Sequence, residues 1–260
     1  MSFEFHKYSA NGNDFIIIDS LKRDLFLSSE ICKQMCDRHD GIGADGVMIL
    51  RSSDRADFFI EIFNSDGSRA NMCSNGLRSC FHFYHKNTDE KKSYTAELAN
   101  KIYEGKVDKA QSSILLDVSN TNFSIKIDLD FCANYKSHGF IDTGVPHLCL
   151  EVEDINSIDV NNLGKTLRNN PYFKHGANIN FFEICEGVIS IRTYERGIEA
   201  ETLSCGSGIL ACAIFLKKKL NLSVFNFRSP GGESIVKFSD QGYEYVGIVN
   251  HVFSGQYFRL

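Results

Sequence analysis

The sequence contains no uninterrupted apolar run near the roughly 18 residues that a membrane-spanning helix needs. Its first residues also lack the basic stretch, apolar stretch and small-residue cleavage site of a secretion signal. Positive charge is not in surplus either, because the formal net charge is −5 and the isoelectric point is near 5.9. We therefore expect a soluble, cytoplasmic globular protein with neither nucleic acid nor a membrane as a partner.

No C-x-x-C pair occurs among the nine cysteines, which disfavours a thiol redox function. In a reducing cytosol an odd number of cysteines can remain free thiols, so we expect no disulfide framework. Cys32, Cys36 and His39 lack a second ligand pair, and we interpret them as structural rather than metal-binding. Gly41-Ile-Gly-Ala-Asp-Gly46 spells G-x-G-x-x-G, but it follows a predicted helix and precedes a predicted strand, the wrong order for a dinucleotide loop.

What the chain does contain is an internal repeat with an offset of about half its length. A strand, a polar turn and a second strand over Phe5–Asp19 recur over Phe140–Val152. The apolar strand predicted at Phe58–Phe63 has a counterpart at Val188–Tyr194. The repeat indicates gene duplication.

Two cysteines occupy equivalent places in the repeat, since Cys205 follows Cys73 by 132 positions. Each opens a segment whose apolar residues fall 4, 7, 8 and 11 positions later, the spacing of one helix face. We therefore predict an α+β fold of two pseudo-symmetric halves, each a curled, mostly antiparallel sheet wrapped around a central helix. We assign residues 1–118 and 248–260 to the first half and residues 119–247 to the second.

Related halves commonly meet through a pseudo-two-fold arrangement with a cleft between them, where the two cysteines would face one another. A cysteine just before a helix is surrounded by unpaired N–H groups and the positive end of the helix dipole, so we expect a lowered thiol pKa. The same N–H groups can hold a substrate carboxylate, and Ser74-Asn75 and Gly206-Ser207 are the candidate cradles.

This arrangement predicts proton transfer at an amino-acid α-carbon. A thiolate on one side removes the α-proton and a thiol on the other side delivers a proton to the opposite face, which inverts the stereochemistry without oxidation or a covalent intermediate. The simpler interpretation of either cysteine alone is a buried helix-start residue. Their symmetric recurrence beside glycine-rich turns favours catalysis.

A set of motifs in this order resembles the diaminopimelate epimerase family. They are Lys7 with Asn11-Gly-Asn-Asp-Phe15, Phe63-Asn-Ser-Asp-Gly67, Cys73-Ser-Asn-Gly76, Gly144-Val-Pro-His147, Glu195-Arg-Gly197 and Cys205-Gly-Ser-Gly208. The resemblance covers nearly the whole chain. It implies a two-domain fold, a small amino-acid substrate, no pyridoxal phosphate or metal cofactor, and interconversion of LL- and meso-diaminopimelate with Cys73 and Cys205 as the acid/base pair. The sequence allows a homodimer but does not determine the oligomeric state.

The resemblance also implies roles for other residues. His147 and Glu195 correspond to groups that orient or assist proton transfer, whereas Asn13, Asn64, Asn178 and Arg196 correspond to ligands of the distal end of the substrate. Without the family, His147 could equally be a structural hydrogen-bonding residue, and Glu195 with Arg196 could be a local ion pair.

The chain departs from the family pattern at three places. Ser74 replaces a common glycine, Val145 stands where many members carry a substrate-binding asparagine, and Ile198-Glu-Ala-Glu201 is one residue longer than usual. A lost amide donor at Val145 weakens discrimination among substrates. The alternatives are therefore a racemase of another amino acid or a non-catalytic amino-acid-binding relative.

Overall fold

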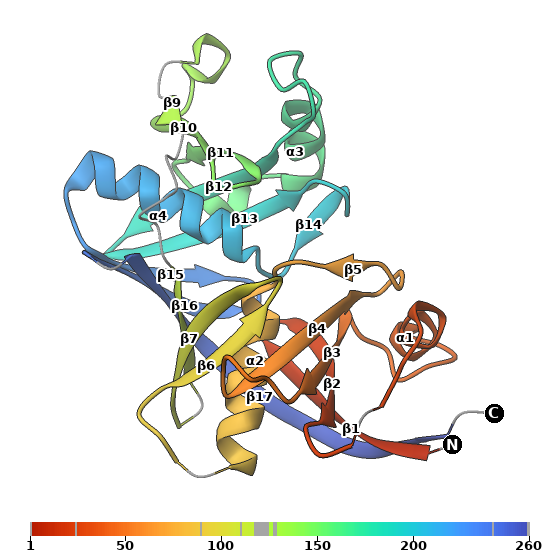
Figure 1. Cartoon of the computed structure of the whole chain (residues 1–260). Coiled ribbons are helices and arrows are strands. Elements are labelled where there is room, and N and C mark those ends of the chain that lie inside the picture. The colour runs from red at the N-terminus through yellow and green to blue at the C-terminus, as the bar shows by residue number, and fades with distance from the viewer. Residues whose placement is uncertain are drawn as a thin grey trace. The chain divides into compact units, whose positions relative to one another are not determined.

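The computed structural model describes residues 2–23, 25–88, 90–109, 111–116, 125–126, 129–240 and 242–258. The chain divides into two compact units, Met1–Leu116 with Val246–Leu260, and Asp117–Tyr245. The predicted boundary between residues 118 and 119 lies outside the described residues, and the one between residues 247 and 248 falls within the last strand. Helices and strands occur in both units (Figure 1), so the predicted α+β class is confirmed. Among the described helices none has the length and apolar character to cross a membrane.

The first unit is built from strands that close into a ring. Its elements are β1 (Ser2–Ala10), β2 (Asn13–Ser20), α1 (Ser29–Cys36), β3 (Gly46–Arg51), β4 (Phe58–Asn64), β5 (Arg69–Ala70), α2 (Ser74–Asn87), β6 (Tyr94–Leu98), β7 (Lys101–Asp108), β8 (Gln111–Leu116) and β17 (Gly242–Phe258). From β1 the pairing runs through β2, β3, β4, β6, β7 and β8 to β17, which pairs again with β1. The two parallel pairs, β2 with β3 and β4 with β6, are those bridged by a helix, as parallel neighbours require a crossover.

Helix α2 is the centre of this unit, where it packs on β1, β2, β3, β7 and β8. The apolar spacing after Cys73 explains this, since Leu77, Cys80 and Phe81 are fully buried. Gly105 on β7 allows the close approach, because a Cβ there would lie 2.3 Å from the Phe81 ring. Ser28 caps the start of α1, because its side chain accepts a hydrogen bond from the Ile31 N–H.

The second unit has the same succession of antiparallel and parallel pairs. Its elements are β9 (Ile125–Lys126), the short 3₁₀ helix Asp130–Cys132, β10 (Ser137–Asp142), β11 (Pro146–Glu151), the 3₁₀ helix Ile155–Ser157, α3 (Val160–Arg168), β12 (Asn178–Cys185), β13 (Val188–Glu195), β14 (Ala200–Thr202), α4 (Gly206–Leu220), β15 (Val224–Ser229) and β16 (Gly232–Ser239). Pairs β11 with β12 and β13 with β15 are parallel, and the others, β9 with β10, β10 with β11, β12 with β13, β13 with β14 and β15 with β16, are antiparallel.

Helix α4 packs on β10, β11, β12 and β16 and is the most apolar helix of the unit. Cys212, Ala213 and Leu216 on it are fully buried, as their spacing from Cys205 predicts. The helix ends at Asn221, which adopts the left-handed conformation that closes many helices. Three lysines, Lys217–Lys219, occupy the last turn, where cations complement the helix dipole.

Candidate active site

Cys73 stands at the N-terminus of α2, as predicted. Its backbone is extended and its carbonyl accepts the N–H of Leu77 at 2.8 Å, so it is the first capping position of the helix. The Sγ atom accepts the backbone N–H of Gly76 at 3.3 Å. Gly76 allows tight packing here, because a Cβ at that position would lie 2.2 Å from the Met48 side chain. Ser74, half-buried, is the first residue of the helix.

Cys205 occupies the corresponding position in the second unit, before α4. Its carbonyl accepts the N–H of Ile209 at 2.9 Å, and its Sγ lies 3.4 Å from the Ser207 hydroxyl. Gly206 opens the helix, as the motif predicts. Glu195, at the end of β13, is close enough to Cys205 to act on its thiol by charge and by hydrogen bonding. The Glu195 carboxylate also accepts a hydrogen bond from Thr202 at 3.0 Å.

The lowered thiol pKa expected from the helix N-termini is wrong. Burial raises the pKa of Cys73 to about 11, although the N–H groups of Gly76 and Asn75 act in the lowering direction. Burial also raises the pKa of Cys205 to about 12, with the negative charge of Glu195 as the next contribution. Desolvation of the thiolate outweighs the helix terminus at both positions, at half-buried Cys73 as well as at buried Cys205.

Asn75 belongs to a buried amide network at the start of α2. Its side-chain Nδ2 lies 3.4 Å from Asn13 Oδ1, and its Oδ1 accepts a hydrogen bond from Arg78 at 2.7 Å. Arg78 is fully buried and also donates to Asn11 at 2.7 Å. Arg78 was not predicted from the sequence. An arginine five positions after Cys73, within an otherwise apolar helix, was the signal available for it.

The β1–β2 turn is held by charge. Asp14 forms ion pairs of 2.7 Å with both Lys7 and Arg38. Burial alone would raise its pKa, but the hydrogen bonds from Arg38 and Lys7 bring it down to about 2. Asn13 donates to the carboxylate of Asp45, which also pairs with Arg38 at 2.8 Å. The structure thus fixes Asn13 between Asp45 and Asn75.

Asn64 differs from Asn13 because it lies on the surface and stabilises a local turn. Its side chain donates to the Ser68 hydroxyl at 2.9 Å across the turn that follows β4, and it is exposed. In the described contacts it holds this turn, whereas Asn13 and Asn75 are linked directly to one another.

His147 is fully buried at the start of β11. Its Nδ1 lies 3.2 Å from the amide nitrogen of Asn180, while its Nε2 has no hydrogen-bond partner among the described residues. Burial lowers the pKa of His147 to about 3, so the imidazole is neutral. Asn180 was not predicted from the sequence. It also donates to the Leu148 carbonyl at 3.0 Å and accepts from Thr193 at 3.0 Å.

Asn178 and Arg196, both of which the resemblance implies as ligands of the distal end of the substrate, lie next to one another. The Asn178 side chain accepts the backbone N–H of Arg196 at 2.8 Å and donates to the Pro146 carbonyl at 3.2 Å. The guanidinium of Arg196 donates to the His175 carbonyl at 3.2 Å. Asn178 therefore ties the turn before His147 to the turn after Glu195.

The family model described as diaminopimelate epimerase matches residues 5–122 and 139–252. The chain belongs to the diaminopimelate epimerase family. A relative of that name from Nitratiruptor sp. is 37% identical over 256 residues, which cover 95% of both chains. Another, from Campylobacter lari, is 39% identical over 213 residues and 80% of both chains.

Solved structures show the same fold at low sequence identity. A PhzF-family phenazine biosynthesis protein from Bacillus anthracis has a TM-score of 0.75, with 15% identity and full coverage of both chains. A hydroxyproline epimerase from Agrobacterium vitis, with trans-4-hydroxy-L-proline bound, has a TM-score of 0.67, with 13% identity and coverage of 98% of this chain and 92% of that one.

In this member of the diaminopimelate epimerase family the remaining cysteines are buried, apart from the exposed Cys185. All nine are free thiols, and Cys80 and Cys212 are fully buried in the helix faces, as predicted. Cys32 and Cys36 belong to the core of the first unit. The described part of the chain contains no group of three or more His, Cys, Asp or Glu that could hold a metal ion. Gly41–Gly46 connects α1 to β3, the order that disfavours a dinucleotide loop.

Proposed function

We propose that this chain interconverts LL- and meso-diaminopimelate by a two-base mechanism in which Cys73 and Cys205 exchange protons with opposite faces of the substrate α-carbon. The observation that carries the proposal is the equivalent placement of the two cysteines, each as the residue that caps a buried helix. Membership of the diaminopimelate epimerase family supports the reaction and the substrate.

The proton balance needs no further reactant. One sulfur, as thiolate, takes the α-proton and becomes a thiol, while the electron pair of the broken C–H bond is delocalised into the substrate carboxylate. The other sulfur, as thiol, gives its proton to the opposite face and becomes a thiolate. Proton exchange with water, or the reverse reaction, returns the two sulfurs to their original protonation states.

The substrate carboxylate must be stabilised as charge develops on it. We assign this task to the backbone N–H groups at the starts of α2 and α4, around Ser74-Asn75 and Gly206-Ser207. Both helices present these groups beside the cysteine, and preorganised N–H donors are effective where water is excluded. The substrate carboxylate would thus accept hydrogen bonds from the N-termini of both α2 and α4.

The two thiols are not equivalent in this mechanism. Burial raises the pKa of both thiols, and the negative charge of Glu195 raises the pKa of Cys205 further. We therefore assign Cys73 as the sulfur that ionises first and Cys205 as the resting acid. Neutral His147, with its buried Nε2, is assigned as a hydrogen-bond donor to the reacting amino-acid group rather than as a base.

For the distal end of diaminopimelate we propose Asn13, Asn64, Asn178 and Arg196. Arg196 carries the only formal positive charge in this set, which suits a carboxylate. The backbone bond from Arg196 to Asn178 supports joint positioning of these two. We further propose that the two units arose by duplication, with pseudo-symmetric halves, since β2–β3 and β4–β6 in the first unit have parallel counterparts β11–β12 and β13–β15 in the second.

The test is α-proton exchange in heavy water with the reduced protein, LL-diaminopimelate and no added cofactor. We expect deuterium incorporation together with formation of the meso isomer. Cys73→Ala and Cys205→Ala should each lower epimerisation at least about 100-fold. Cys185→Ala is the matched control, because Cys185 is an exposed free thiol on β12. If both variants kept native rates of α-proton exchange and epimerisation, the assignment of Cys73 and Cys205 as the two bases would be contradicted.

A second candidate is epimerisation of another amino acid. Val145 favours it, since an apolar side chain in the β10–β11 turn provides no amide donor to a distal substrate group. Glutamate, aspartate, histidine and lysine in the same exchange assay test it. Faster exchange with one of these than with diaminopimelate would change the substrate but retain the two-base chemistry. Exchange with neither diaminopimelate nor any of these four amino acids would indicate a non-catalytic relative.

A further inference from the structure

The turn between β13 and β14 is closed by its last residue, Glu199. The Glu199 N–H donates to the Glu195 carbonyl at 2.8 Å, so residues 195–199 form one compact turn. Glu199 has a positive φ of 59°, the left-handed conformation that residues other than glycine rarely adopt. Such a conformation persists only where the surrounding contacts hold it. The contacts of the Glu199 side chain provide this support.

The Glu199 carboxylate is folded back onto its own turn. One of its oxygens, Oε1, accepts the Gly197 N–H at 3.0 Å and the Nε–H of Arg168 at 2.8 Å. The other, Oε2, lies 3.4 Å from the hydroxyl of buried Tyr194. The hydrogen bond from the Gly197 N–H, followed by that from Arg168, holds the pKa of Glu199 below its usual value, so the carboxylate is ionised at neutral pH. One carboxylate therefore ties the turn to both α3 and β13.

Arg168 joins this turn to the turn that carries Asn178. It is the last residue of α3, which packs on β12, β13 and β14 (Figure 1). Its guanidinium lies against Gly176, because a Cβ at that glycine would overlap the Arg168 Nη1 atom. Gly176 stands two positions before Asn178, whose side chain accepts the Arg196 N–H at 2.8 Å. Arg168 is thus in contact with both turns whose residues are assigned to the distal end of the substrate.

We propose that Arg168 and Glu199 are positioning residues for the distal carboxylate of the substrate. Their ion pair holds the turn of residues 195–199 against α3 and fixes the backbone of Arg196, so that its guanidinium is preorganised for the carboxylate. The proposal rests on the proposed function, in which Arg196 binds that carboxylate. The Arg168 side chain is 20% exposed and that of Glu199 is 45% exposed, so we expect the pair to order the turn and to add little to the stability of the whole chain.

Steady-state kinetics with LL-diaminopimelate and the full-length protein test the proposal. Glu199→Gly is the most informative variant, because glycine adopts the left-handed conformation freely while the carboxylate is lost. We expect KM to rise about tenfold while kcat stays within about twofold, the pattern of lost substrate binding. The melting temperature should change by less than about 2 °C, since the relieved backbone strain offsets the lost contacts. Arg168→Met should give the same increase in KM.

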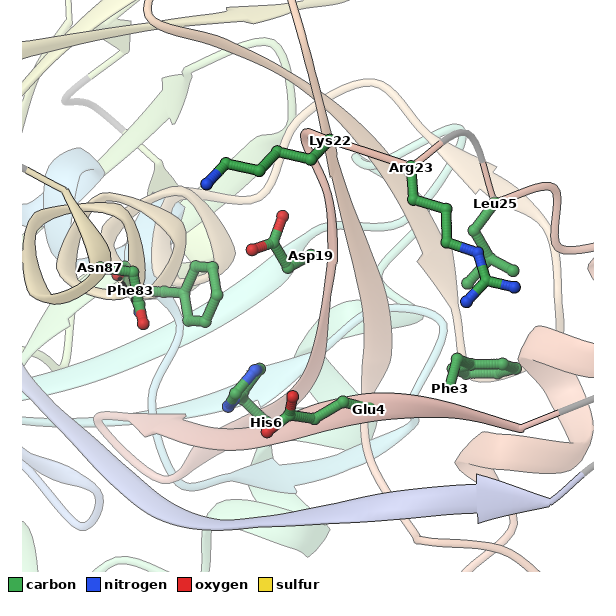
Figure 2. A pocket seen from close by; sticks show the side chains of 9 residues that line it. All are labelled: Phe3, Glu4, His6, Asp19, Lys22, Arg23, Leu25, Phe83 and Asn87. Carbon is green, nitrogen blue, oxygen red and sulfur yellow. Dashed lines mark hydrogen bonds between the residues drawn. The ribbon is translucent and has the colours of Figure 1, made fainter.

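A double-mutant cycle tests whether the two side chains act as a pair. The variant that combines Arg168→Met with Glu199→Gly should have the KM of either single variant rather than the product of the two effects. Arg23→Met is the matched control and should keep the native KM and kcat. Arg23 is an exposed arginine of the first unit, its side chain points away from that of Lys22, and no hydrogen bond joins it to another of the residues drawn in Figure 2.

The possible failures are distinguishable. Native turnover with an unchanged KM in Glu199→Gly and Arg168→Met would overturn the positioning role and leave the proposed function intact. So would effects on KM that multiply in the double variant. A lower kcat at constant KM would also overturn it, because the turn would then act through Glu195 on Cys205. Absence of turnover by the native chain would instead contradict the proposed function, and with it the role of Arg196 on which this proposal rests.

Discussion

The amide nitrogen of Asn180 lies 3.2 Å from Nδ1 of His147. Because Asn180 is oriented by Leu148 and Thr193, its nitrogen is a donor, and Nδ1 of the imidazole must accept. The proton of neutral His147 then resides on Nε2, which has no partner within the described part of the chain. Asn180 is thus a positioning residue that makes His147 a buried hydrogen-bond donor.

Asn180→Asp tests this relationship. A carboxylate would accept from Nδ1–H, move the proton to that nitrogen and raise the pKa of His147. We expect kcat to fall by about 100-fold with a smaller change in KM, since the donor at Nε2 is lost. The ¹⁵N chemical shifts of His147 should report the change of tautomer. Thr193→Val, which removes one bond to Asn180, is the milder control, and an unchanged tautomer in Asn180→Asp would contradict the assignment.

The raised thiol pKa values predict an alkaline pH dependence. Only the thiolate removes a proton, and burial raises the pKa of Cys73 to about 11. The value of kcat/KM should therefore still be increasing at pH 9, with a slope approaching tenfold per unit where the thiolate is the limiting species. A plateau reached below pH 8 would mean that the thiol pKa is not raised in the working enzyme.

Asp14 contributes stability that acid removes. Its folded-state pKa is lowered to about 2, below the usual 3.8, so the contribution is complete above about pH 4 and is lost as the pH falls toward 2. From that shift we expect Asp14→Asn to reduce the free energy of unfolding at pH 7 by about 2 kcal/mol. Urea unfolding at pH 7 and at pH 2.5 measures it. The difference between the variant and the native chain should shrink at the lower pH, and a constant difference would exclude the ion pairs with Lys7 and Arg38 as the cause.

Gly76 is expected to be intolerant of even one methyl group. A Cβ there would lie 2.2 Å from the end of the Met48 side chain, so Gly76→Ala should destabilise the chain by about 1–3 kcal/mol. Met48→Ala opens the space, and the double variant should lose less stability than the two single changes add up to. Additive losses in thermal unfolding would show that the clash lies elsewhere.

The features that could be predicted from the sequence are those that depend on the local pattern of residues. The apolar spacing after Cys73 and Cys205 identified both central helices, because this spacing follows from helix geometry. The thiol pKa direction was wrong because it depends on how much protein surrounds the sulfur, which helix position alone does not reveal. Asn180 was missed for a related reason: its register opposite Cys149 on β11 is set by strand pairing across a helical crossover.

The ring of the first unit has a consequence for biosynthesis. It closes only when β17 pairs with β1, and that register places Ser2 opposite Phe258. The sheet of β1 to β8 therefore lacks a strand until β17, which follows the second unit in the sequence, has been made, so the first unit cannot complete its sheet before the second unit has been synthesised. During synthesis the segment carrying Cys73 therefore has β1 and β8 unpaired on one side until β17 has been made.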